Sequence, residues 1–185
     1  VVRKVRKQVP AWNIGQHIGF KAALASGNAN SYQRPTMSLS GTAVLQYTGG
    51  TTGVSKGAEL THKNLVANLI QVDALFQVAF GKGEQDAQTI LCALPLYHIF
   101  AFMVCAMYGM YKGSLNVLVP NPRDIPGLVK EVDKYRPSFF PAVNTLFNAL
   151  VHNEDFKNLD HSMMKLAMGG GMAVLPSTAQ AWQDI

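Results

Sequence analysis

The chain has 185 residues, of which 48% are hydrophobic and 15% charged, which is enough for one sizeable hydrophobic core. This composition is that of an ordinary globular protein and excludes a collagen-like or intrinsically disordered chain. The formal net charge of +5 comes largely from Arg3, Lys4, Arg6 and Lys7, since the rest of the chain is close to neutral. A basic run of this kind can bind nucleic acid or an anionic membrane, but it is more often a solvated helix face, and we predict no nucleic-acid partner.

Cysteine usage and apolar stretches set the expected cellular environment. Cys92 and Cys105 lie in apolar surroundings without a C-x-x-C spacing, which predicts reduced, buried thiols and neither a zinc site nor a disulfide framework. We expect no signal peptide, because the charged N-terminus is not followed by an apolar stretch. The long apolar stretch 94–111 is interrupted by proline, histidine and glycine, so we predict a buried core helix and not a membrane span. A cytoplasmic location follows from these expectations.

In chain order, residues 1–41 are predicted to form a basic helix and a connecting segment, and residues 42–185 an α/β portion. Apolar, β-type runs predict strands at 42–48, 89–94, 114–119, 138–143 and 165–168, and 58–61 is expected to be extended. Helical spacing with capping and proline signals predicts helices at 62–80, 99–111, within 120–135, at 144–152, and from Pro176 onward. Pro141 would weaken the strand 138–143 or place it at a sheet edge.

Strands that alternate with helices in this way favour an α/β fold. The strands are nearly continuous in apolar residues, which predicts a mostly parallel sheet flanked by helices on both faces. The sequence stops inside a predicted helix that has no C-cap signal. We therefore interpret the chain as a fragment of a longer protein, truncated at its C-terminus.

The stretch 47-YTGGTTGVSKGAEL-60 concentrates glycine, threonine and one lysine directly after the predicted strand 42–48. Loops at the carboxyl ends of strands are where open α/β sheets bind ligands, and we expect this loop to lie at such an end. Glycines allow successive backbone N–H groups to converge on an anion, while threonine hydroxyls and Lys56 add further donors. The stretch therefore predicts a polyphosphate site.

Two common phosphate motifs do not explain this loop. A Walker A loop needs Ser or Thr after its lysine, but Gly57 follows Lys56, and the Rossmann fingerprint needs a glycine spacing that 49-GGTTG-53 lacks. A merely mobile linker would not carry three glycines and three threonines within residues 48–53. A different phosphate-binding mechanism is therefore expected.

The string 47-YTGGTTGVSKG-57 resembles the phosphate-binding signature of adenylate-forming enzymes, the superfamily of acyl-CoA synthetases, luciferases and peptide-synthetase adenylation domains. That signature usually reads [YF]-T-S-G-T-T-G-x-P-K-G, so Gly49 replaces a serine and Ser55 replaces a proline, while Lys56 is kept. The resemblance implies catalytic roles for Lys56 and Thr48, with Thr48 also as a metal ligand for Mg²⁺. It implies ATP-binding roles for Tyr47, Thr48, Gly49, Gly50, Thr51, Thr52, Gly53, Val54, Ser55, Lys56, Gly57 and Ala58.

The stretch 94-LPLYHIFAF-102 resembles the Pro-Leu-x-His motif that lies by the carboxylate pocket in this superfamily. An isolated histidine is more often a structural residue than a catalyst, but the neighbouring loop favours a catalytic role for His98. The resemblance further implies that Tyr97, His98 and Phe102 belong to the substrate pocket. Apolar residues of the following helix either line a long apolar slot or are plain core, and both interpretations stay open.

The stretch 168-MGGGMAVLP-176 places Gly169, Gly170 and Gly171 after a short predicted strand, where they permit the close approach of a flat ligand. In the superfamily the equivalent glycines pass along the adenine and acyl pocket, which implies cofactor binding by all three and substrate contact by Gly170 and Gly171. The alternative is a tight turn before the helix that Pro176 opens. The stretches 121–135 and 144–150 resemble bacterial long-chain fatty-acid–CoA ligases specifically.

The resemblance implies a two-step reaction of the parent protein, in which ATP and a long-chain fatty acid give an acyl adenylate, and coenzyme A then gives the thioester. ATP, Mg²⁺ and coenzyme A are the implied cofactors and co-substrates. The glutamate, ribose-binding acid and C-terminal lysine that the family uses are not found in this chain, so the chain alone is expected to be inactive.

Other interpretations remain open at this point. One is a non-catalytic nucleotide-binding module, and another is an adenylating enzyme for an aryl or amino acid. We also hypothesise peripheral contact with the inner face of the cell membrane through the basic run. A homodimer, or association through truncated sheet edges, is a further hypothesis.

Overall fold

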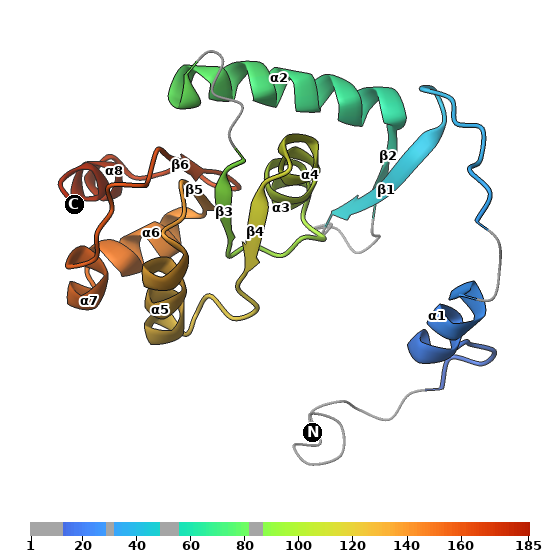
Figure 1. Ribbon diagram of the computed structural model, residues 1–185, viewed down its shortest axis with the longest axis horizontal. Helices are drawn as coiled ribbons and strands as arrows, with labels where there is room; N and C mark the ends of the chain where they lie inside the picture. Colours follow the sequence, from blue (N-terminus) through green and yellow to red (C-terminus); the bar gives the residue numbers. More distant parts are fainter. Residues whose placement is uncertain (1–12, 29–31, 49–55, 82–86) are drawn as a thin grey trace. The chain divides into compact units, whose positions relative to one another are not determined.

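The structure is a computed structural model that describes residues 13–28, 32–48, 56–81 and 87–185 (Figure 1). The chain divides into two units, residues 1–37 and residues 38–185. In the first unit the described helix is α1 (Phe20–Asn28), which follows an irregular segment. All other helices and strands described below belong to the second unit.

The first two strands form an antiparallel hairpin. β1 (Thr42–Thr48) pairs with β2 (Lys56–Thr61), with Thr48 opposite Lys56 at the open neck of the connecting segment. The predicted strand 42–48 and the extended segment 58–61 are confirmed, but the expectation that 42–48 joins the parallel sheet is wrong. Only residues 49–55 connect β1 to β2, whereas a parallel connection needs roughly a dozen or more residues.

The main sheet has four parallel strands in the order β4-β3-β5-β6 (Figure 1). Its members are β3 (Thr89–Cys92), β4 (Leu115–Leu118), β5 (Phe139–Ala142) and β6 (Leu166–Gly169). The predicted α/β class with a mostly parallel sheet is therefore confirmed.

Helices cover both faces of this sheet. On one face lie α2 (His62–Phe80), α3 (Ile99–Ala101), the π-helix η1 (Phe102–Met107) and α4 (Tyr108–Lys112). Their side chains pack on Ile90 and Phe139. On the other face lie α5 (Ile125–Tyr135), α6 (Asn144–Val151), α7 (Glu154–Lys157) and α8 (Pro176–Gln183), around Leu91 and Phe140. Neighbouring strand residues point to opposite faces, which gives the sheet two buried sides.

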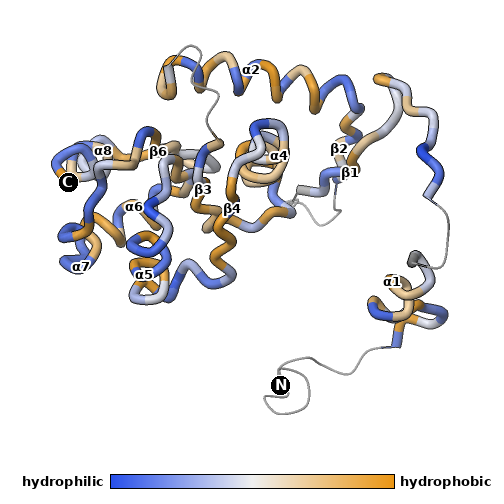
Figure 2. Tube along the Cα trace, in the orientation of Figure 1, coloured by the Kyte–Doolittle hydropathy of each residue, from blue (hydrophilic) through white to orange (hydrophobic). Residues whose placement is uncertain are grey.

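The long helix α2 begins where the sequence predicts. The Thr61 hydroxyl accepts a hydrogen bond from the Asn64 N–H at 3.3 Å, and the Asn64 side chain accepts one from the Thr61 N–H at 3.0 Å. This capping box satisfies two backbone donors that the helix itself leaves unpaired. The bands of hydrophobic and hydrophilic residues along α2 in Figure 2 show its amphipathic pattern.

The apolar stretch after β3 forms the predicted core helix, but its middle is a π-helix. Asn116 on β4 donates from Nδ2 to the Cys105 carbonyl at 3.0 Å, which gives a partner to one carbonyl of η1. Gly109 lies against this amide, where a Cβ would clash with Asn116. Both cysteines are buried and free, as predicted. Among the described residues, no helix is long and apolar enough to cross a membrane.

The expectation that Pro141 places its strand at a sheet edge is wrong, because β5 lies between β3 and β6 and Pro141 is fully buried. The N–H groups of Leu166 and Gly170 donate to the carbonyls of Ser138 and Ala142. Backbone hydrogen-bonding groups alternate sides along a strand, so those of the even-numbered residues of β5 point toward β6. Pairing with β3 is found at Phe139 and does not extend to Pro141, whose missing N–H lies on the side of β3. The proline therefore shortens the ladder with β3 and leaves the ladder with β6 intact.

Candidate functional site

The predicted phosphate loop connects the two strands of the hairpin, not two elements of the parallel sheet. The predicted ligands Gly49, Gly50, Thr51, Thr52, Gly53, Val54 and Ser55 lie outside the described residues, as does the side chain of Thr48. The backbone of Thr48 pairs with Lys56, whose side chain is exposed at the start of β2. The described part of the chain therefore fixes where this loop begins and ends.

Tyr47 and Gly57 form a cross-strand pair at the neck of the hairpin. The Tyr47 ring lies across Gly57, because a Cβ added to Gly57 would stand 3.1 Å from the Cζ of Tyr47. This is tighter than ordinary van der Waals contact, so a larger residue at 57 would displace the ring. Ala58, the last of the predicted loop residues, pairs with Gln46 one step further along the strands.

Gln46 joins the hairpin to the segment that follows β3. Its Nε2 lies 3.2 Å from the Tyr47 carbonyl oxygen and 3.2 Å from the Tyr97 carbonyl oxygen. One side-chain amide thus donates both its hydrogens to backbone oxygens of two predicted site segments. Sequence reasoning missed this residue, since a lone glutamine in a strand carries no distinguishing signal.

His98 is held at the N-terminus of α3. Its N–H donates to the Pro95 carbonyl at 2.9 Å, and its Nδ1 accepts the N–H of Phe100 at 3.3 Å. Because Nδ1 accepts, Nε2 carries the hydrogen of the neutral ring and is the ring atom that can donate to a ligand. The Tyr97 side chain is 83% exposed, so the segment keeps its place through its backbone.

An apolar cavity of about 680 Å³ opens at the carboxyl ends of all four parallel strands. It is lined after β3 by Ala93, Leu94, Pro95, His98 and Phe100, after β4 by Pro122, Arg123 and Ile125, after β5 by Val143, Thr145, Leu146 and Ala149, and after β6 by Gly171 and Met172. The polar lining side chains are those of His98, Arg123 and Thr145. A largely apolar cavity with a few polar groups, at this edge of an α/β sheet, fits a small-molecule site.

Some of the predicted pocket residues line the apolar cavity and others do not. His98 and Gly171 line the cavity, whereas Tyr97 and Phe102 are not among its lining residues. Gly170 lies directly under the Phe100 ring, since an added Cβ would stand 2.6 Å from the Cζ of Phe100.

Gly169 lines a smaller cavity of about 200 Å³ beside Trp182. Arg123 and Thr145 were missed by sequence reasoning, although both follow predicted strands and the carboxyl-end rule could have found them.

The described residues offer no ready metal site, and neither of the two buried cysteines is among the residues that line the apolar cavity. The described part of the chain contains no group of three or more His, Cys, Asp or Glu side chains that could hold a metal ion. The hydrogen bond between the two cysteines, together with burial, raises the pKa of Cys105, and the same hydrogen bond lowers the pKa of Cys92 to about 7. The chemistry of this cavity depends on hydrogen-bond donors and apolar walls.

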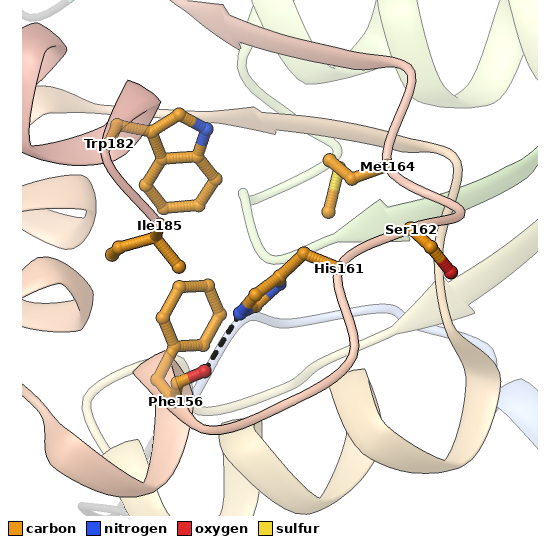
Figure 3. A pocket seen from close by; sticks show the side chains of 6 residues that line it. All are labelled: Phe156, His161, Ser162, Met164, Trp182 and Ile185. Atoms are coloured by element: carbon orange, nitrogen blue, oxygen red, sulfur yellow. Dashed lines mark hydrogen bonds between the residues drawn. The ribbon is translucent and has the colours of Figure 1, made fainter.

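A second cavity, of about 400 Å³, lies between the loop before β6 and the end of α8 (Figure 3). Its lining includes Phe156, His161 and Trp182, and His161 Nε2 lies 2.8 Å from the Phe156 carbonyl oxygen. His161 precedes β6, so this cavity is on the amino-terminal side of that strand. It is thus separate from the site at the carboxyl ends.

The parallel sheet, the cavity at its carboxyl ends and the adjoining glycine-threonine hairpin together indicate a ligand-binding α/β domain of the adenylate-forming type. Residues 4–185 match the family of AMP-binding enzymes, and the chain belongs to this family. It is 45% identical over its whole length to the long-chain-fatty-acid–CoA ligase of Haemophilus influenzae, and 43% identical to that of Yersinia pestis. It spans 33% and 32% of those two proteins, about a third of their length.

The fold is also that of solved structures. The crystal structure of a fatty acid AMP ligase from Legionella pneumophila matches 89% of this chain with a TM-score of 0.71 and 23% identity, over 28% of that protein. At this identity the similarity shows the fold alone. The family resemblance predicted from the glycine-threonine stretch is confirmed by these comparisons.

Proposed function

We propose that the full-length protein containing this chain activates long-chain fatty acids, first to acyl adenylates and then to acyl-CoA thioesters. The observation that carries this proposal is the apolar cavity of about 680 Å³, with His98 on its wall and the hairpin hydrogen-bonded to the same segment. Whole-chain identity of 43–45% to long-chain-fatty-acid–CoA ligases supports the acyl substrate.

In the first step, a carboxylate oxygen attacks the α-phosphorus of ATP. A new phosphorus–oxygen bond forms, the bond to the bridging oxygen breaks, and pyrophosphate leaves with that electron pair. Charge builds on the departing pyrophosphate, where the Lys56 ammonium and the N–H and hydroxyl donors of residues 48–55 would stabilise it. His98 Nε2–H would donate to a carboxylate oxygen and orient the acid, while the apolar cavity walls bind its chain.

In the second step, the sulfur of coenzyme A attacks the acyl carbonyl carbon, AMP leaves with the electron pair of the broken acyl–oxygen bond, and the thiol proton passes to solvent. Mg²⁺ would accompany ATP, with Thr48 as the candidate ligand in this chain. The described residues do not form a magnesium site by themselves, and no step above depends on one. The 185-residue chain alone is expected to be inactive.

We further propose a cytoplasmic protein with peripheral contact to an anionic membrane surface, supported by the basic residues Arg3, Lys4, Arg6 and Lys7. Sedimentation with vesicles containing anionic lipid tests this contact, which should weaken as salt rises and on charge reversal of these residues. Homodimer formation is proposed as well, and light scattering of the full-length protein tests it.

The activity is tested by incubating the full-length protein with ATP, palmitate and coenzyme A and identifying the products by mass spectrometry. Palmitoyl-CoA, AMP and pyrophosphate in equal amounts are the expected products. ATP binding without any acid-dependent product would contradict the proposal and favour a non-catalytic nucleotide-binding module. Products with benzoate or an amino acid, but not with palmitate, would assign a different acid.

A further inference from the structure

The most informative contact outside the predicted motifs is the one that Gln46 makes. Its side-chain amide donates to the Tyr47 carbonyl and to the Tyr97 carbonyl, both at 3.2 Å. Tyr47 is the first residue of the glycine-threonine stretch, and Tyr97 directly precedes His98. A single side chain thus connects the hairpin neck to the wall of the apolar cavity.

Among the described residues, the other hydrogen bonds that hold the turn before α3 are local. The turn from Pro95 to His98 is closed by the His98 N–H, and the His98 ring is held by the Phe100 N–H. Both of these bonds are local, within three residues. The bond from Gln46 crosses 51 positions of sequence, and it is the side-chain hydrogen bond that fixes this turn relative to the hairpin among the described residues.

This arrangement matters for a reaction between two substrates. If the proposed function is correct, the hairpin holds the phosphates of ATP and the cavity holds the acid, with its carboxylate beside His98. In-line attack requires the carboxylate oxygen and the α-phosphorus each to lie within a few tenths of an ångström of its reactive position. A misplacement of about 1 Å can lower the rate roughly 100-fold. The distance between the hairpin and the turn therefore bears directly on rate.

We propose that Gln46 is a positioning residue that sets the distance between the hairpin neck at Tyr47 and the carboxylate site beside His98. This inference rests on the proposed function, and it goes beyond the family's signature, which begins one residue later. Gln46 acts through the Tyr97 backbone and touches neither substrate. Its loss should therefore impair the joint arrangement of the two substrates and leave the binding of each one alone nearly intact.

The test compares the full-length wild-type protein with Gln46→Met, which keeps the size of the side chain without donors, and with Gln46→Glu, which places acceptors against two carbonyl oxygens. The matched control is Gln180→Met, which removes a 2.8 Å hydrogen bond to Asp184 on the exposed surface of α8. The measurements are the affinity for α,β-methylene-ATP alone, the affinity for palmitate alone, the melting temperature, and kcat and KM for palmitate-dependent exchange of pyrophosphate into ATP.

For both Gln46 variants we expect each separate affinity to stay within about threefold of the wild type, while kcat for exchange falls roughly 10- to 100-fold. The control should match the wild type in every one of these measurements. Exchange unchanged in both Gln46 variants would overturn the inference while leaving the proposed function intact. Separate affinities and melting temperature that fall in step with kcat would also overturn it, because a structural role would then explain the loss. No exchange by the wild-type protein would instead refute the proposed function, and the inference with it.

Discussion

A substitution at Gly170 tests whether this glycine packs closely under the Phe100 ring, which lines the apolar cavity. In Gly170→Ala, the new Cβ would stand 2.6, 2.7 and 2.9 Å from three atoms of the Phe100 ring, where ordinary contact begins at 3.4 Å. The ring must therefore move by about 0.8 Å. Phe100 packs on one side against the core beneath α2 and lines the cavity on the other, so the ring can move only against the core or into the cavity.

Each direction of movement has a measurable cost. Overpacking of this kind typically destabilises a protein by about 1–3 kcal/mol, and a ring displaced into the cavity takes space from the acid. We expect Gly170→Ala to lose free energy of unfolding in this range, measured by denaturant titration, or to bind palmitate about tenfold more weakly, measured by calorimetry.

Two variants control this experiment. Gly27→Ala in α1 makes the same chemical change where nothing lies within 4 Å of the new Cβ, and because alanine favours a helix it should lower neither property. Combining Gly170→Ala with Phe100→Leu should recover most of the loss, because the smaller side chain makes room. A Gly170→Ala protein with wild-type stability and wild-type palmitate affinity would refute the packing argument.

Three further variants test other parts of the account. Lys56→Ala should slow pyrophosphate exchange about 100- to 1000-fold, as expected for a lost transition-state donor. The melting temperature should not fall, because the Lys56 side chain is exposed; unchanged exchange would contradict the role of Lys56. Thr61→Ala should lower the free energy of unfolding by about 1 kcal/mol through the lost cap of α2, and a change below about 0.3 kcal/mol would contradict the capping box. Burial, with a smaller effect of the Asp73 charge, raises the pKa of Tyr108 to about 12. The contribution of neutral Tyr108 to the free energy of unfolding is therefore complete below about pH 10 and is lost as the pH rises toward 12. Denaturant titrations at pH 9 and 11 should show a smaller alkaline loss in Tyr108→Phe than in the wild type or in the exposed control Tyr97→Phe, and equal losses would contradict this assignment.

The positions of most helices and strands could be predicted because they depend on local signals. The apolar spacing of α2, its Thr61 cap and the proline that opens α8 are all readable within a few residues. Pairing of strands is not local. The sequence places a strand at 42–48, but whether it joins β2 or the parallel sheet depends on the length of the connection, which the predicted α/β alternation overlooked.

In the candidate site, too, some residues are predictable from local signals and others depend on contacts between distant parts of the chain. His98 was predictable because its motif is a short string, and the carboxyl-end rule could have led to Arg123 and Thr145. Gln46 could not be found in this way, since its importance comes from a hydrogen bond across 51 residues. Pro141 was misjudged for a related reason, because its tolerance inside the sheet depends on which neighbour its strand pairs with at that position.

The central claim is that the hairpin and the apolar cavity together join ATP to a long-chain carboxylic acid. The most direct test measures the exchange of labelled pyrophosphate into ATP by the full-length protein, with acetate, octanoate, palmitate or benzoate as the acid. We predict exchange that rises from acetate to palmitate and is weak with benzoate. A protein that binds ATP but shows no exchange with any of these acids would contradict it.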